Sequence, residues 1–173
     1  MIRKSITLSL QEQVDAIKNK GRFAVSMSNP SFNSKNLTNI NLPSYNLQGQ
    51  LSGENKLKDI ARKKLFSNWT TNKFRSNILI TNGAKAALYC VFKSIANKKN
   101  NNFGIINPNW PTYIDLINLC NAKPLFYNTY YEDNFDIDIR NLEIFIKRNK
   151  LKLLVLSSPN NPCGKIYDKK TIS

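Results

Sequence analysis

The sequence contains no histidine. This absence excludes Ser–His–Asp and Cys–His catalysis in this chain, together with metal sites that need an imidazole ligand. Only six glycines occur in 173 residues, and they form neither a G-x-G-x-x-G pattern nor a Walker A loop. The sequence therefore lacks the usual patterns of dinucleotide and P-loop nucleotide sites.

Cysteines and long apolar runs are also scarce. Cys90, Cys120 and Cys163 show no C-x-x-C spacing, so neither a disulfide framework nor a zinc site is indicated. Cys90 and Cys120 fall within apolar helical patterns, which predicts buried, reduced side chains. No apolar stretch has the length of a membrane span, and no signal-peptide segment follows Met1. We expect a cytoplasmic protein that binds neither a metal nor a membrane.

Acidic residues are few, and 26 basic residues against 11 acids give a net charge of +15. Such a charge is typical of proteins that bind nucleic acids or anionic membranes. However, 20 of the basic residues are lysines, whereas recognition of phosphates and bases favours arginine. Lysine is encoded by A/T-rich codons, as are asparagine and isoleucine, which occur 26 and 18 times. We therefore favour compositional drift over nucleic-acid binding.

The periodicity of apolar residues predicts regular elements along most of the chain. The predicted helices cover residues 9–20, 54–66, 84–96, 113–121 and 138–149. The predicted strands cover residues 77–81, 103–107, 123–127 and 151–157. Residues 28–46 lack periodicity and predict an extended arm. The alternation of strands and helices predicts βαβ units, with a largely parallel sheet that helices cover on both faces.

In such sheets, ligands bind at the carboxyl ends of the strands, and three predicted strands lead into unusual loops. Gly83 opens a helix whose free N–H groups, with Lys85, suit an anion, although an ordinary turn explains them too. Trp110 suits a flat aromatic ligand or a cap on the core. Asn161, between two prolines, is a fixed amide donor or an Asx turn. Together they suit a phosphorylated heteroaromatic ligand.

Five segments resemble class I/II aminotransferases, the fold type I enzymes that use pyridoxal 5'-phosphate (PLP). ITNGAKAALY (80–89) is similar to the phosphate loop T-x-G-[AGS]-K-Q-A-L, and NPNWPTY (107–113) is similar to P-x-[WY]-x-x-Y. SSPNNPCGKIY (157–167) resembles the signature S-x-P-N-N-P-T-G-x-x-Y. AVSMSNPSF (24–32) and YNLQGQLSGENKLKDIA (45–61) resemble upstream family segments in the same order. The resemblance is to the N-terminal half of the family.

The resemblance implies an α/β fold, a three-layer sandwich with a mainly parallel sheet, preceded by a helix and an extended arm. Residues 1–46 would be the helix and arm, which belong to the small domain and the dimer contact. Residues 47–173 would be the N-terminal portion of the PLP-binding large domain. A homodimer is implied for a full-length chain.

Carried over to this sequence, the family motifs assign a role to each loop. Gly83, Ala84 and Lys85 would hold the PLP phosphate. Trp110 would stack on the pyridine ring. Asn161 would donate a hydrogen bond to the phenolic oxygen and lie near the substrate carboxylate.

Other matched positions are less regular. Tyr45 would reach the phosphate in a neighbouring subunit, although its spacing from Leu57 is longer than usual. In the family, a glycine that lines the substrate pocket falls near the position of Asn29. We take Asn29 as a substrate-binding candidate. Ala86 replaces the usual Gln, and Cys163 replaces the usual Thr.

The implied activity is transfer of an amino group between an amino acid and a 2-oxo acid, with PLP as cofactor. A PLP-dependent lyase or synthase of the same fold is an alternative, as is a non-catalytic basic remnant that binds anions or nucleic acid. In the family, the Schiff-base lysine follows the segments matched here, and Lys169 and Lys170 do not resemble its context. We therefore expect no catalytic residue in this chain, which resembles an N-terminal fragment that is inactive alone.

Overall fold

The computed structural model describes residues 6–24, 52–65, 78–96, 99–168 and 171. The chain divides into two compact units, Met1–Ile78 and Leu79–Ser173, which are described separately. The predicted domain boundary at residue 46 and the predicted arm at residues 28–46 lie outside the described residues. Both stay predictions.

The first unit contains two of the predicted helices, α1 (Ile6–Asn19) and α2 (Asn55–Leu65). Gly21 follows α1 with a φ of +71°, and its N–H donates to the Lys18 carbonyl over 2.9 Å. This left-handed residue ends the helix as the sequence predicts. The large apolar side chains of α2 are exposed, with Leu65 at 73%.

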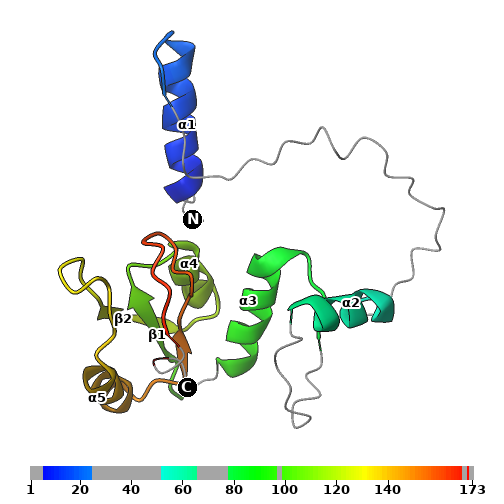
Figure 1. The fold of residues 1–173 in the computed structure, drawn as a ribbon, viewed down its shortest axis with the longest axis vertical. Helices are drawn as coiled ribbons and strands as arrows, with labels where there is room; N and C mark the ends of the chain where they lie inside the picture. The colour runs from blue at the N-terminus through cyan, green and yellow to red at the C-terminus, as the bar shows by residue number, and fades with distance from the viewer. Residues whose placement is uncertain (1–5, 25–51, 66–77, 97–98, 169–170, 172–173) are drawn as a thin grey trace. The chain divides into compact units, whose positions relative to one another are not determined.

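The second unit contains a parallel sheet of three strands in the order β2-β1-β3 (Figure 1). The strands are β1 (Asn102–Asn107), β2 (Lys123–Asn128) and β3 (Leu153–Val155). The helices are α3 (Gly83–Ile95), α4 (Thr112–Leu119) and α5 (Ile139–Asn149). α4 connects β1 to β2, and α5 connects β2 to β3. These are the predicted βαβ units.

Helices cover both faces of the sheet because side chains alternate along the central strand β1. Phe103 and Ile105 belong to a cluster with Phe92 of α3 and Ile117 of α4. Ile106 belongs to a second cluster with Leu142 of α5 and other residues. The two clusters place α3 and α4 against one face and α5 against the other. The predicted three-layer α/β fold with a mainly parallel sheet is confirmed.

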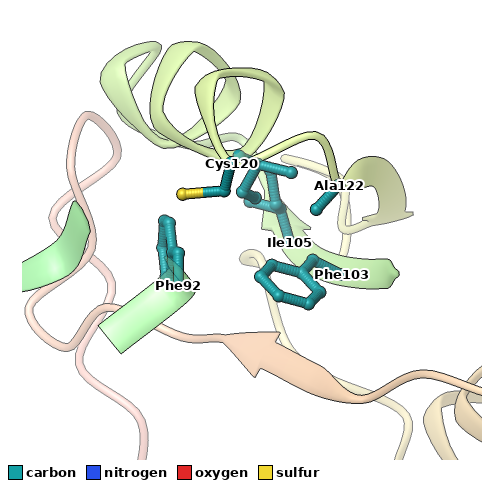
Figure 2. Packing of buried hydrophobic residues seen from close by; sticks show 6 residues of the cluster. Phe92, Phe103, Ile105, Cys120 and Ala122 are labelled. Carbon is teal, nitrogen blue, oxygen red and sulfur yellow. The ribbon is translucent and has the colours of Figure 1, made fainter. Parts of the chain in front are cut away.

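The first cluster packs side chains from β1, α3 and the α4 region against one another (Figure 2). The rings of Phe92 and Phe103 meet edge to face, with centroids 5.8 Å apart. Cys120 is buried beside them, as the sequence predicts, and this burial raises the pKa of its thiol, although the charge of Lys93 acts to lower it. The thiol is therefore a packing group rather than a nucleophile.

Cys90 contradicts the corresponding prediction, because its side chain is exposed. It precedes the buried Phe92 by two residues, which is about 200° around the helix axis. Val91, another apolar residue of α3, is 48% exposed. α3 therefore buries a narrower face than its apolar pattern predicts.

Two predicted strands differ from the structure. Residues 78–81 pair with no strand among the described residues, and Asn77 lies outside these residues. A strand exists only through its ladder partners, and no described strand pairs with this segment. The strand predicted at 151–157 is confined to β3, because only residues 153–155 pair with β1.

Gly104 of β1 packs closely against the side chains of Leu151 and Leu154. A Cβ atom added there would lie 2.5 Å from Leu151 Cδ1 and 3.0 Å from Leu154 Cδ1. We expect Gly104→Ala to lower the free energy of unfolding by about 1–3 kcal/mol through overpacking. Chemical denaturation would measure this change. The same substitution in a Leu151→Ala background should cost less, and equal costs in both backgrounds would contradict the packing argument.

Candidate functional site

The loops that follow β1 and β3 lie at the same edge of the sheet because these strands are parallel neighbours. The Asn160 side chain, after β3, donates from Nδ2 to the Pro108 carbonyl, after β1, over 3.1 Å. The start of α3 reaches the same loop, since Lys85 Nζ lies 5.5 Å from the centroid of the Trp110 ring. The structure thus brings together the three loops that the sequence singled out.

The first turn of α3 is open to solvent, and Gly83, Ala84 and Lys85 are all exposed. Gly83 has a φ of +82°, and a Cβ atom there would meet nothing within 4 Å. Its N–H donates to the Thr81 carbonyl over 2.8 Å, so Gly83 provides the turn rather than a free donor. The next N–H groups have no acceptor within the helix. These N–H groups and the Lys85 ammonium are the donors that an anion would meet at this turn.

Asn82 occupies the N-cap position of α3, but its side chain makes no capping hydrogen bond. Thr81 instead donates from Oγ1 to the Gly83 carbonyl over 3.0 Å. The protein therefore holds the turn without covering the first N–H groups of the helix. An anion can approach them directly.

Trp110 is half-buried in the loop between β1 and α4, two residues before α4 begins. Its ring meets Tyr113 edge to face at a centroid distance of 5.5 Å, and Lys85 Nζ lies over it at the same distance. An indole face attracts cations and flat aromatic rings. The Lys85 contact shows that this face lies near the first turn of α3.

Asn161 is exposed, and its side chain has no hydrogen-bond partner among the described residues. The alternative interpretation of Asn161 was an Asx turn. Asn160 forms that turn instead, because its Oδ1 accepts from the Cys163 N–H over 3.3 Å. Asn161 therefore remains available to a ligand. Sequence reasoning missed Asn160, although the Asn-Asn pair was a signal that the two residues could divide these tasks.

Further asparagines at the ends of β1 and β2 also escaped sequence reasoning. Asn107 Nδ2 donates to Asn128 Oδ1 over 3.0 Å, and Asn109 Nδ2 donates to Asn107 Oδ1 over 2.8 Å. The Thr129 hydroxyl donates to the Asn107 carbonyl over 2.8 Å. These bonds hold the start of the loop that carries Trp110. Only their pairing across neighbouring strands reveals this role.

The end of the third loop is fixed by Tyr167 and Lys165. Tyr167 is buried, and its N–H donates to Ser158 Oγ over 3.1 Å. Burial raises the pKa of the Tyr167 phenol, and the charges of Cys163 and Asp136 add to the increase. The phenol stays neutral at physiological pH. Lys165 pairs with Asp136 at 2.6 Å.

Tyr45 and Asn29, the two remaining candidates, lie outside the described residues and stay predictions. In the part of the chain that the structure describes, acids and thiols form no group of three or more that could hold a metal ion. Within the same residues, no helix is long and apolar enough to cross a bilayer.

The sequence profile of the family "Aminotransferase class I and II" matches residues 35–173. The chain belongs to this family. An asparagine–oxo-acid transaminase from Streptococcus mutans is 30% identical to it, over 99% of this chain and 45% of the relative. A probable aspartate aminotransferase from Methanocaldococcus jannaschii is 31% identical, over 70% of this chain and 31% of the relative. The chain thus spans less than half the length of these curated relatives.

Solved structures show the same fold. An aspartate aminotransferase from Thermus thermophilus, solved with maleate, superposes on 99% of this chain with a TM-score of 0.77 and 20% identity. An aspartate aminotransferase from Thermotoga maritima gives a TM-score of 0.72 and 22% identity over 99% of this chain. The match covers 46% and 47% of these two chains. At these identities the likeness concerns the fold alone.

Proposed function

We propose that this aminotransferase-family chain provides the phosphate, ring and phenolic-oxygen contacts of a PLP site. The observation that carries the proposal is the meeting of three loops at one sheet edge, through the Asn160–Pro108 hydrogen bond and the Lys85–Trp110 contact. The activity would be transfer of an amino group between an amino acid and a 2-oxo acid. When bound, PLP would supply an electron sink for carbanion chemistry.

The first turn of α3 suits the phosphate group of PLP. The N–H groups of Ala84 and Lys85, the positive end of the helix and the Lys85 ammonium all favour a dianion. The open space at Gly83 leaves room for phosphate oxygens to approach the backbone. Lys85 also lies close enough to Trp110 for one ligand to touch both residues.

Trp110 and Asn161 suit the ring of the same ligand. The indole face would stack on the pyridine ring and fix its plane. The free Asn161 amide would donate to the phenolic oxygen and lie near the carboxylate of the substrate. We also assign Tyr45 to the phosphate of a neighbouring subunit and Asn29 to the substrate pocket, within a cytoplasmic homodimer.

The names of the curated relatives support transamination over lyase or synthase chemistry. The Streptococcus mutans relative is named for asparagine and an oxo acid, and the Methanocaldococcus jannaschii relative for aspartate. We infer a small polar amino acid as the amino donor. Substrate assays with asparagine and aspartate, on a longer chain that also carries the family's Schiff-base lysine, test this choice.

Substitutions at Asn161 and Trp110 test the proposed contacts. Loss of a hydrogen bond to a polarised oxygen costs roughly 1.5–3 kcal/mol, so Asn161→Ala should weaken PLP binding by about tenfold or more. Trp110→Ala should have a comparable effect, because base-like rings gain roughly 1–3 kcal/mol by stacking on aromatic side chains. Equilibrium dialysis with PLP measures both affinities.

Asn118→Ala, at an exposed asparagine of α4, is a matched control that should leave PLP affinity unchanged. Inorganic phosphate is a second probe, because it should bind Asn161→Ala as well as it binds the unaltered chain. Unchanged PLP affinity in both the Trp110 and Asn161 variants would remove the case for these roles. Equal phosphate binding after Lys85→Ala would remove the case for the phosphate site.

A further inference from the structure

Asn160, in the loop after β3, is held by hydrogen bonds of both its backbone and its side chain. Asn160 is buried, with a residue exposure of 6%. Its N–H donates to the Lys165 carbonyl, and its carbonyl accepts from the Gly164 N–H, each over 2.8 Å. The loop that contains Asn161 is therefore closed on the backbone of Asn160.

The Asn160 side chain extends this fixation to a second loop. Nδ2 donates to the Pro108 carbonyl over 3.1 Å, across 52 residues of sequence. Oδ1 accepts from the Cys163 N–H over 3.3 Å and from the Cys163 thiol over 3.0 Å. A buried amide that uses both its donor and its acceptor is costly to disrupt, because each lost bond leaves a buried polar group without a partner.

We propose that Asn160 is a positioning residue that fixes the spacing between Trp110 and Asn161. Pro108 precedes Trp110 by two residues, and Asn160 directly precedes Asn161. The bond between Asn160 and Pro108 thus joins the residue proposed to stack on the ring to the residue proposed to donate to the phenolic oxygen. The inference rests on the proposed function, and Asn160 itself need not touch the ligand.

Only an amide of this length meets both requirements of the position. Aspartate keeps an acceptor for the Cys163 N–H but places a second oxygen against the Pro108 carbonyl, where a donor is needed. Asn160→Asp therefore removes the bridge between the loops and leaves the local turn bond available. This variant separates positioning from the shape of the loop.

A single fluorescent reporter makes the test specific. The chain has two tryptophans, Trp69 and Trp110, so Trp69→Phe leaves Trp110 as the reporter. The matched control is Asn102→Ala, because Asn102 Nδ2 donates to the Asn149 carbonyl over 2.7 Å at the opposite end of β1. Both substitutions remove one side-chain bond to a distant backbone carbonyl. Circular dichroism compares their folding.

The first readout uses the chain without ligand. Acrylamide quenching of Trp110 fluorescence should rise about twofold in Asn160→Asp and stay unchanged in Asn102→Ala. The second readout is equilibrium dialysis, in which PLP affinity should fall roughly three- to tenfold in Asn160→Asp alone, the effect of one net hydrogen bond. Affinity for inorganic phosphate should not change in either variant, because α3 provides that site.

Unchanged Trp110 quenching in Asn160→Asp would overturn the inference, as would an equal change in Asn102→Ala. If Asn160→Asp does not fold, Asn160→Ser takes its place, and the same expectations apply. If the unaltered chain binds no PLP, the proposed function fails. The ligand-free quenching still decides whether Asn160 positions Trp110, so the two failures are distinguishable.

Discussion

A polypeptide of residues 1–173 alone, supplied with PLP, is expected to show no amino-acid-dependent turnover. Transamination needs a lysine that bonds the cofactor and moves protons, and no lysine here stands in a segment that resembles the one the family uses. Lys85 lies over Trp110 at the first turn of α3, where it suits a phosphate rather than the reacting carbon.

Borohydride reduction of the chain with PLP, followed by peptide mapping, measures whether PLP bonds to one specific lysine. Scattered, substoichiometric labelling is expected from a chain with 20 lysines. Chain denatured before the addition of PLP is the control, and it should give the same labelling pattern. Stoichiometric labelling of one lysine together with turnover would contradict the prediction.

Phe103→Ala should cause the largest loss of stability among single core truncations. Phe103 is fully buried on the central strand and meets Phe92 edge to face. Removing such a ring costs about 3–5 kcal/mol, because it loses transfer free energy and leaves a cavity. That loss is a large part of the total stability of most domains. Urea denaturation followed by circular dichroism measures the free energy of unfolding.

Phe126→Ala is the matched control for this truncation. Phe126 lies on the neighbouring strand β2, opposite Ile105, but it is 41% exposed. Because folding buries less apolar area at Phe126 than at Phe103, its truncation should cost about 1–2 kcal/mol. Equal losses for Phe103→Ala and Phe126→Ala would show that the core is not centred on β1.

Local sequence patterns determined most of the elements because their causes are local. Asp138 precedes α5 and accepts from the Asn141 N–H through its side chain, which starts the helix where the pattern predicts. Gly83 and Gly21 adopt the positive φ values that their turns require. The alternation of strands and helices sufficed to predict a parallel sheet covered on both faces.

Long-range pairing decided what local patterns could not. Residues 78–81 have an apolar sequence typical of a strand, yet they carry no ladder, because a strand depends on a partner that its own sequence does not specify. Cys90 and Val91 have apolar side chains but are exposed, because the width of the buried face of α3 depends on what packs against it.

The candidate site also combines residues that the sequence identified with contacts that only the tertiary structure showed. The sequence alone identified Gly83, Lys85, Trp110 and Asn161, because each is an unusual residue at a predicted strand end. Only the tertiary structure showed that Asn160 bonds to the loop of Trp110 and leaves Asn161 free. A hydrogen bond across 52 residues has no local signature, since it exists only after β1 and β3 pair in parallel and bring their carboxyl ends together.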